Sequence, residues 1–156
     1  MKILNISDAA ALAIHSMIIL CATPEERVNL KEIAKILGAS EHHLSKVMQR
    51  LVKVGIISSV RGPSGGFLLK KNALSKSVLE ILEIFEGEAE RNPCLMKREE
   101  CVVGSCIYND FLEKINSQVI NYLSSYKLKD LLNRNIKEFL DTKNKFIKNR
   151  EKEVKI

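Results

Sequence analysis

Apolar residues recur every three or four positions along most of the chain, the spacing that places them on one face of a helix. The first such stretch, residues 8–22, is apolar on most faces and predicts a largely buried helix. Ser7 stands where an N-cap is needed, and Asp8 puts a negative charge in the first turn, where the helix dipole favours it. A turn through Pro24 follows.

Two short helices come next, joined by a Leu-Gly-Ala-Ser turn. The first is expected to end at Gly38, because glycine accepts the left-handed backbone that closes many helices. The second is expected to begin after the N-cap Ser40 and to stop at Gly55. Two helices joined in this way are a helix-turn-helix signature. The positions expected to face the core are Leu30, Ile33, Ala34 and Leu37 in the first helix and Leu44, Val47, Met48, Leu51 and Val52 in the second.

A β-hairpin is predicted after the second helix. Residues 56–60 and 67–69 are short runs rich in β-branched or bulky apolar residues, and Arg-Gly-Pro-Ser-Gly-Gly separates them. A helix-turn-helix followed by a hairpin makes a winged helix. We therefore expect a mainly α fold with a small β-hairpin, in which residues 1–88 form a winged helix-turn-helix DNA-binding domain.

The second half of the chain predicts a helix at residues 74–86, with Val78, Leu82 and Phe85 facing inward and Gly87 ending it. We expect a cysteine-rich cluster-binding loop at residues 89–106 and a dimerisation helix at 107–126. A C-terminal helix and a basic tail should follow at 127–156.

The long helix at 107–126 carries an apolar stripe too wide for an unpartnered helix. The stripe either lies back on its own domain or pairs with the same helix of a second subunit. The second alternative is favoured, because the winged domain is small and already has a core. The stripe is formed by Phe111, Ile115, Val119 and Tyr122, widened by Leu112, Ile120 and Leu123.

Charge is unevenly distributed along the 156 residues, whose formal net charge is +6. Residues 28–72 hold eight Lys and Arg against two Glu, whereas residues 73–126 are acidic. A localised basic segment indicates a nucleic-acid surface on the winged domain. An ordinary solvated helix face is the alternative, but the glycine-rich wing favours close approach to DNA. The residues expected to contact DNA are Ser40, His42, His43, Ser45, Lys46, Gln49, Arg50, Lys53, Arg61, Gly62, Ser64 and Gly65.

Three of the four cysteines, Cys94, Cys101 and Cys106, fall in one short loop. Thiolates bind soft metal ions and iron–sulfur clusters, and nearby cations favour the ionised form. Reactive thiols and structural zinc are alternatives, although the close two-residue spacing of zinc knuckles is absent. Cys21 stands apart in an apolar stretch and is expected to be a buried thiol. A reducing cytoplasm therefore fits better than a disulfide framework.

Several function classes lack their motifs here. The sequence has no Cys-x-x-Cys, no phosphate-binding glycine motif, no Ser-His-Asp constellation and no metal-hydrolase histidine pair. We therefore expect neither enzyme activity nor a small-molecule substrate. The apolar run at residues 9–22 is too short to span a bilayer, so we expect a cytoplasmic protein without a membrane partner. Binding of another protein remains an alternative, because winged helices serve both uses.

Four features in this order resemble the Rrf2 family of bacterial winged-helix regulators, of the IscR, NsrR and CymR type. They are residues 40–56, the wing at 60–67, the three-cysteine loop, and the Tyr-Lys-Leu-Lys-Asp-Leu-Leu run at 126–132. The resemblance implies a homodimer in which the long helices cross. Each winged domain would read half of a pseudo-palindromic operator in double-stranded DNA, with Arg61 in the minor groove.

The resemblance also implies a 2Fe-2S or 4Fe-4S cluster on the cysteine loop. The protein would then be a transcriptional regulator, expected to be a repressor, that senses iron–sulfur status, nitric oxide or redox state. IscR-type members carry a histidine three residues after the last cysteine, where this chain has Asn109. NsrR-type members use an aspartate of the other subunit, and Asp8 stands at the matching place. His15 is the reserve ligand, and otherwise a core histidine. The alternative is a cluster-free regulator that uses reactive thiols or a protein partner, for example in cysteine or sulfur metabolism.

Overall fold

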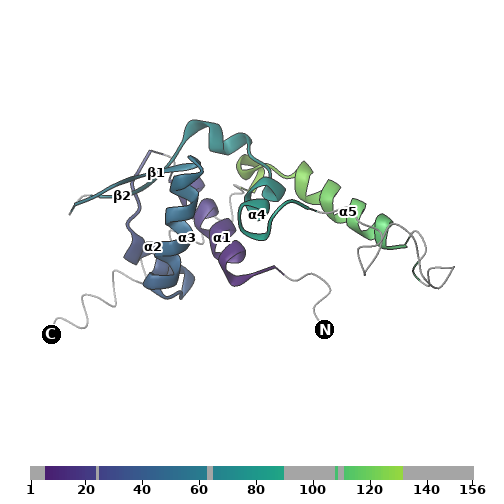
Figure 1. Ribbon diagram of the computed structural model, residues 1–156. Helices are drawn as coiled ribbons and strands as arrows, with labels where there is room; N and C mark the ends of the chain where they lie inside the picture. Colours follow the sequence, from purple (N-terminus) through teal and green to yellow (C-terminus); the bar gives the residue numbers. More distant parts are fainter. Residues whose placement is uncertain (1–5, 24, 63–64, 90–107, 109–110, 132–156) are drawn as a thin grey trace.

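The computed structural model describes residues 6–23, 25–62, 65–89, 108 and 111–131. This part of the chain is mainly helical with one small antiparallel hairpin, which confirms the expected fold class (Figure 1). Its elements are α1 (Asp8–Ala22), α2 (Leu30–Leu37), α3 (Glu41–Lys53), β1 (Ile57–Val60), β2 (Gly66–Leu69), the 3-10 helix η1 (Lys71–Ser75), α4 (Val78–Glu86), α5 (Phe111–Ser125) and the 3-10 helix η2 (Leu128–Leu131).

The predicted helix caps are confirmed. The Ser7 hydroxyl accepts the Ala10 N–H at 3.2 Å and starts α1. The Ser40 hydroxyl accepts the His43 N–H at 3.5 Å and starts α3. Gly38 ends α2 with a φ of 66°, in the left-handed region that glycine occupies without strain. These local signals fix where α1 and α3 begin and where α2 ends.

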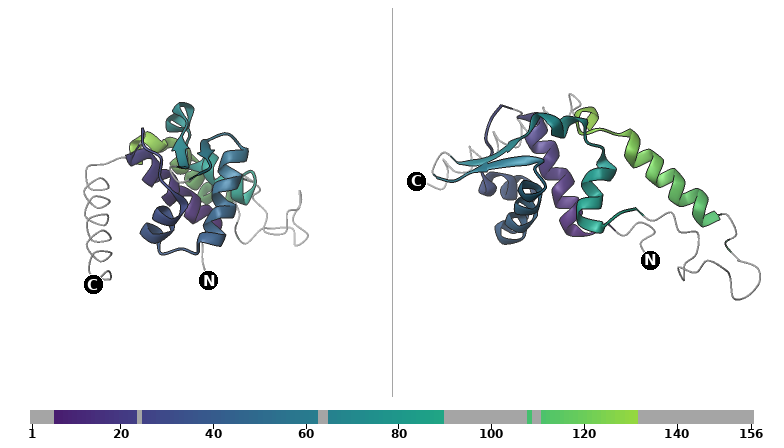
Figure 2. Two further views of the ribbon diagram at one scale, coloured as in Figure 1. Left: turned by 90° about the vertical axis from the view of Figure 1, so that its left-hand side faces the viewer. Right: turned by 45° about the horizontal axis from the view of Figure 1, so that its top comes forward.

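The core forms where α1 packs against α3 and α4 (Figure 2). Met17 and Leu20 of α1 meet the inner face of α3, where Leu44, Met48 and Leu51 are completely buried. Because these side chains fix the rotation of α3 about its axis, the opposite face of that helix must point away from the protein. The polar residues of α3 are thus presented to solvent by packing.

The turn-side end of β2 is paired with Val28, two residues before α2. β1 and β2 pair with Val60 opposite Gly66, and Val28 forms a further bridge to Phe67. Two backbone hydrogen bonds make this bridge, from Val28 N–H to the Phe67 oxygen at 3.0 Å and from Phe67 N–H to the Val28 oxygen at 2.9 Å. Gly66 has a φ of 151°, and a Cβ there would lie 2.8 Å from the Val28 oxygen. The sequence predicted only a turn before α2, so this third strand partner is a correction.

The predicted helix at residues 74–86 begins later than expected. Residues 71–75 form the 3-10 helix η1, and α4 starts at Val78 after the N-cap Ser77. Ile81, which was not among the predicted inward residues, is completely buried, and Phe85 is only half-buried. Ser77 and Glu80 explain the later start, because they form a capping box that fixes the N-terminus of α4.

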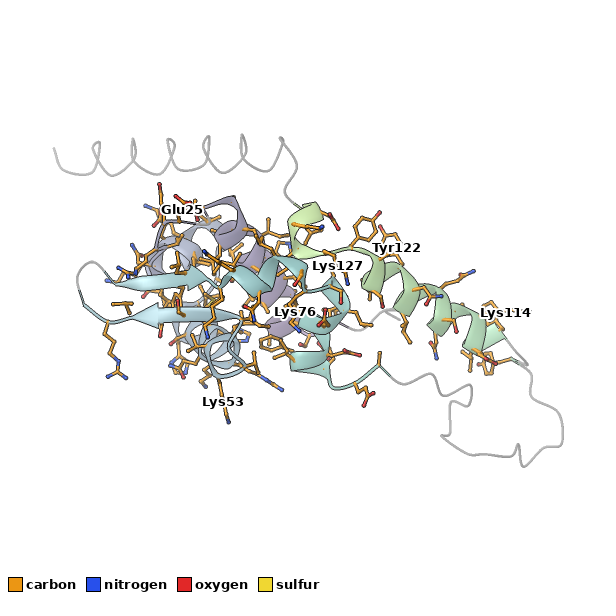
Figure 3. All side chains as sticks on the ribbon, turned by 90° about the horizontal axis from the view of Figure 1, so that it is seen from above. Glu25, Lys53, Lys76, Lys114, Tyr122 and Lys127 are labelled. Atoms are coloured by element: carbon orange, nitrogen blue, oxygen red, sulfur yellow. The ribbon has the colours of Figure 1, made fainter. Side chains whose placement is uncertain are left out.

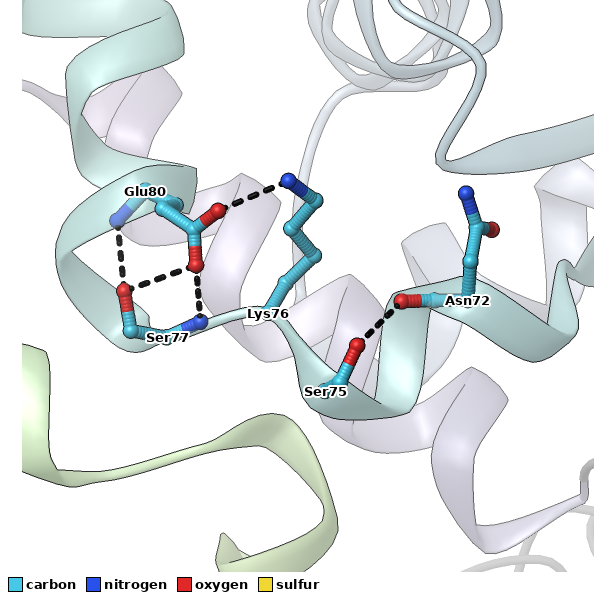
Figure 4. A network of polar contacts seen from close by, with 5 residues as sticks. All are labelled: Asn72, Ser75, Lys76, Ser77 and Glu80. Atoms are coloured by element: carbon cyan, nitrogen blue, oxygen red, sulfur yellow. Dashed lines mark hydrogen bonds and ion pairs between the residues drawn. The ribbon is translucent and has the colours of Figure 1, made fainter.

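The capping box is part of a small polar network (Figure 4). The Glu80 carboxylate accepts the Ser77 N–H at 2.7 Å, and the Ser77 hydroxyl accepts the Glu80 N–H at 3.1 Å. The other carboxylate oxygen pairs with Nζ of Lys76 at 2.7 Å. The hydrogen bond from Lys76, followed by that from the Ser77 backbone, lowers the pKa of Glu80 to about 2.

The long helix α5 extends away from the winged domain and is anchored at its C-terminal end (Figures 1 and 2). The Val78 N–H donates to the Tyr126 oxygen, and the Leu128 N–H donates to the Lys76 oxygen, both at 2.9 Å. Leu128 itself is completely buried in the core. The predicted C-terminal helix appears in the described residues only as the 3-10 turn η2, and its continuation lies outside them.

No helix in the described ranges has both the length and the apolar character that crossing a bilayer requires.

Candidate nucleic-acid interface

The outward face of α3 is built from polar side chains. Successive residues of an α-helix are rotated by about 100°, so His42, Lys46 and Lys53 lie opposite the buried side. All three are exposed, as the sequence predicted, and Figure 3 shows Lys53 pointing away from the body of the protein. These side chains form the centre of the candidate interface.

One flank of α3 faces the wing across an open groove of about 880 Å³. Ser45 and Gln49 line it from the helix, and the Gln49 amide donates to the Ser45 hydroxyl at 3.3 Å. Arg61, Gly62 and Gly65 line it from the wing. The structure thus brings five of the predicted residues, two from the helix and three from the wing, around one concave surface.

The tip of the wing is shaped by its glycines. Gly62 has a φ of 116°, and its carbonyl oxygen accepts the Gly65 N–H at 2.9 Å. A Cβ at Gly65 would lie 2.3 Å from the Val60 oxygen, so a side chain there has no room. The turn leaves Arg61 exposed beside the groove. Ser64, also predicted to contact DNA, lies outside the described residues.

The groove has a third wall that sequence reasoning missed. Asn29, the N-cap of α2, and Lys31 in its first turn line the groove opposite α3. The bridge from Val28 to the wing places them there, and no local sequence pattern shows that contact. One sequence feature could have indicated Lys31 as a DNA contact: it is a basic residue in the first turn of the first helix of the predicted helix-turn-helix.

The other flank of α3 faces α1 and α4. His43 lines an open groove of about 410 Å³ together with Ser40 and with Asp8 and His15 of α1. Further along the helix, the Arg50 guanidinium lies over the ring of Phe85 in α4, with its carbon 5.1 Å from the ring centroid. The end of α3 is therefore in direct contact with the last turn of α4.

Asp8 and His15 face the same groove, as their spacing on α1 predicted. Both are exposed, so the core-histidine reading of His15 is wrong. The His15 Nδ1 lies 2.7 Å from the Ala11 carbonyl oxygen, which can only accept a hydrogen bond, so Nδ1 is the donor in this contact.

The cysteines divide into two groups. Cys94, Cys101 and Cys106 lie outside the described residues. Cys21 is 1% exposed, and burial raises the pKa of its thiol to about 11, so it stays protonated and inert. This confirms the predicted buried thiol. Within the described ranges, no three His, Cys, Asp or Glu side chains are grouped so that they could hold a metal ion.

The sequence matches the family described as Rrf2, iron-dependent transcriptional regulator, over residues 6–134. The chain belongs to the Rrf2 family. The HTH-type transcriptional regulator IscR of Photorhabdus laumondii is 33% identical over 83% of this chain and 74% of that protein. The HTH-type transcriptional regulator NsrR of Geobacillus kaustophilus is 33% identical over 69% of this chain and 75% of that protein. The solved structure of CymR, described as the global cysteine regulator of B. subtilis, superposes with a TM-score of 0.70 at 27% identity, covering 83% of this chain and 96% of that one.

Membership of the Rrf2 family makes the protein a winged helix-turn-helix transcriptional regulator, a class that binds DNA, and not an enzyme. The polar face of α3 and the wing groove of this Rrf2 protein are then the surface on which DNA binding has to be sought. The relatives differ in name between IscR, NsrR and CymR, so family membership alone does not assign the signal.

Proposed function

We propose that this Rrf2 regulator binds duplex DNA as a homodimer, with α3 in the major groove and the wing against the neighbouring minor groove. One observation carries the proposal: the polar centre of α3 continues into the concave groove shared with the wing. The major groove is about 12 Å wide and admits one α-helix. A wing beside that helix then meets the adjacent backbone and minor groove.

The residues divide by position into three kinds of contact. His42, Ser45 and Gln49 present donors and acceptors along the helix axis, where base edges would lie. Lys46 and Lys53 supply charge for phosphates, which fix the register of the protein on the duplex. Arg61 at the wing would enter the minor groove, whose negative potential attracts arginine. His43, Arg50, Gly62, Ser64 and Gly65 complete the proposed surface.

The dimer is supported by an uncovered face of α5. Ile120 is buried against its own subunit, and the helix rotation puts Phe111 and Tyr122 on the opposite side. Their side chains are 55% and 62% exposed. An exposed apolar stripe of this kind is usually buried in an interface, and a second copy of α5 could bury it in a two-fold symmetric dimer. Two winged domains related in this way match an operator with two half-sites.

We infer that Cys94, Cys101 and Cys106 hold an iron–sulfur cluster and that Asp8 of the partner subunit is the fourth ligand. The donor set fits, because thiolates are the usual ligands of such clusters. Asp8 is exposed in the first turn of α1, and no hydrogen bond or ion pair joins its carboxylate to another described residue. A bound cluster would supply a centre that reacts with oxidants and nitric oxide. The chain would thereby act as a repressor that responds to iron–sulfur, nitric oxide or redox status.

The similarity to CymR favours a second candidate for the signal. Its structure is described as that of a global cysteine regulator, and it covers most of this chain. In this alternative, the same three cysteines act as reactive thiols, or a protein partner carries the signal, and no cluster is bound. The DNA-binding surface is the same in both cases.

Selection of duplexes from a random-sequence library, followed by binding titrations at several salt concentrations, tests the DNA-binding proposal. We expect affinity to fall steeply with salt, with a log–log slope of about −0.9 for each phosphate contact. Lys46→Ala and Lys53→Ala should each make the slope less steep, whereas Lys129→Ala on the exposed side of η2 should not. Weak binding that ignores salt would instead favour a protein partner for the winged domain.

Anaerobic purification distinguishes the bound cluster from the cluster-free alternative. Visible spectra with iron and sulfide analysis should show a cluster in the wild type, none in Cys101→Ala, and an altered spectrum in Asp8→Ala. The Cys21→Ala variant is the matched control, because its thiol is buried and protonated. A colourless, iron-free wild type that still binds the selected duplex would support the reactive-thiol alternative. An unchanged spectrum in Asp8→Ala would remove the ligand from the partner subunit.

A further inference from the structure

We propose that Phe85 is a positioning residue for a DNA phosphate contact made by Arg50, so that the last turn of α4 sets how firmly α3 holds DNA. This inference rests on the proposed DNA-binding function. It gives α4, which otherwise only packs on the core and precedes the cysteine segment, a part in binding through Arg50.

The contact is a cation–π pair. The guanidinium carbon of Arg50 lies 5.1 Å from the centroid of the Phe85 ring, inside the distance at which the ring face attracts a cation. Arg50 is exposed, whereas Phe85 is half-buried and packs against the core. The ring is therefore the fixed member of the pair, and the arginine is the member whose freedom is reduced.

The geometry leaves the arginine able to bind an anion. A guanidinium carries five N–H donors, more than contact with one ring face can occupy, so donors remain for a phosphate. No carboxylate among the described residues forms an ion pair with Arg50. An exposed arginine normally samples many rotamers, and ordering it on binding costs free energy. Holding the side chain in place before DNA arrives lowers that cost.

The place of Arg50 on α3 favours phosphate over a base. It follows Lys46 by four residues and precedes Lys53 by three, at the edge of the outward face that turns toward α4. The opposite edge, with Ser45 and Gln49, borders the wing groove. Side chains at the edges of a helix in the major groove meet the backbone, where contacts hold the protein in register.

The turn that carries Phe85 is itself held in place. Its neighbour Glu86 accepts the Ser7 N–H at 2.8 Å, which ties the turn to the start of α1. A shift of this turn moves the ring relative to Arg50 and so changes a phosphate contact. The end of α4 is therefore joined to α3 through Phe85 and to the start of α1 through Glu86.

A double-mutant cycle tests the pair. Wild type, Phe85→Leu, Arg50→Ala and the double variant are titrated with a fluorescein-labelled duplex of mixed sequence at several salt concentrations. Phe85→Leu should weaken binding by about two- to five-fold per subunit, the range of one exposed cation–π contact. Arg50→Ala should weaken binding and reduce the magnitude of the salt slope by about one for each arginine removed. In the Arg50→Ala background, Phe85→Leu should have no further effect.

Two further variants exclude a general loss of packing. Phe85→Tyr keeps the ring and should retain wild-type affinity. Ile84→Ala removes a half-buried side chain from the same helix without touching Arg50, so it should lower the thermal midpoint but leave affinity unchanged. Equal effects of Phe85→Leu in both backgrounds, or a loss of affinity in Ile84→Ala as large as in Phe85→Leu, would overturn the inference. A wild type that binds no duplex even at low salt would refute the DNA-binding proposal first, and the inference with it.

Discussion

The backbone N–H of Ser7 donates to Oε1 of Glu86 at 2.8 Å, joining two residues that are 79 positions apart. The bond ties the start of α1 to the end of α4. Asp8, the proposed ligand for the partner subunit's cluster, follows Ser7 directly, and Phe85 precedes Glu86. The hydrogen bond therefore joins the segment that carries Asp8 to the turn that carries Phe85. A signal from the proposed cluster would reach α3 through these two residues.

We predict that Glu86→Ala removes the hydrogen bond that joins the start of α1 to the end of α4. The Ser7 amide should then exchange with solvent faster, because its acceptor is gone. The hydroxyl and the backbone N–H of Ser7 lower the pKa of Glu86, so the bond is present above the usual glutamate pKa of 4.5 and is lost as the pH falls through the lowered value. The pH dependence of the Ser7 amide chemical shift measures this, and Glu88→Ala is the matched control. A transition at or above pH 4.5 would contradict the contact.

A second pH-dependent contribution comes from Glu80. Its pKa is lowered to about 2 by Lys76 and Ser77, so its stabilising effect is complete above 4.5 and is lost as the pH falls toward 2. Glu80→Gln keeps an oxygen acceptor but removes the charge. We expect Glu80→Gln to lower the unfolding free energy by about 1 kcal/mol or less at neutral pH, because the side chain is 40% exposed. The variant should also lose less stability than the wild type as the pH falls.

Urea unfolding at a series of pH values measures this difference. Glu113→Gln, on the exposed side of α5, is the control and should leave the acid profile as in the wild type. If the unfolding free energies of the wild type and Glu80→Gln fell in parallel with pH, the Glu80 carboxylate would not be stabilised by its contacts in the capping box.

Local signals explain most of what could be predicted from the sequence. The caps at Ser7 and Ser40, the glycine at Gly38 and the helical spacing of the apolar residues each act within a few positions. The exposed face of α3 followed from the same spacing, because the buried side of a helix determines its outward side. Cys21 was correctly taken as a buried thiol for the same reason.

The features that were missed all depend on contacts between distant segments. Nothing near Val28 in the sequence shows that it pairs with Phe67, and nothing near Arg50 shows that it meets Phe85. Periodicity gives the orientation of an element about its own axis but not the identity of its neighbour. The late start of α4 is different, because Ser77 and Glu80 form a recognisable capping box that the helical pattern at Leu74 outweighed.

Leu128 shows the same dependence on a distant contact and gives a third prediction. It is completely buried, and its N–H bonds to the Lys76 oxygen at 2.9 Å, so it fastens the end of α5 to the winged domain. Leu128→Ala should cost about 2–5 kcal/mol of unfolding free energy, the usual range for a buried leucine. Urea unfolding at a single protein concentration measures the loss, and Lys129→Ala is the control. A cost as small as that of Lys129→Ala would show that the anchor is not needed for folding.

The last prediction concerns the uncovered face of α5. Tyr122→Lys places a charge on the proposed dimer interface, where burial of an unpaired ammonium is unfavourable. We expect the variant to sediment as a monomer at concentrations at which the wild type is a dimer. Its helix content should be unchanged, because Tyr122 is 62% exposed within the subunit. Affinity for the selected duplex should fall steeply, since two half-sites must then be bound independently.

Asn121→Lys is the matched control, because it adds the same charge one position away, on the exposed polar side of α5 beside Gln118. This variant should remain a dimer and keep its affinity. If Tyr122→Lys also remained a dimer, the stripe would not be the interface. If it became a monomer but bound the duplex as tightly as the wild type, the two half-sites would not be read together. The face opposite Ile120 thus links an observed exposure to both assembly and DNA binding.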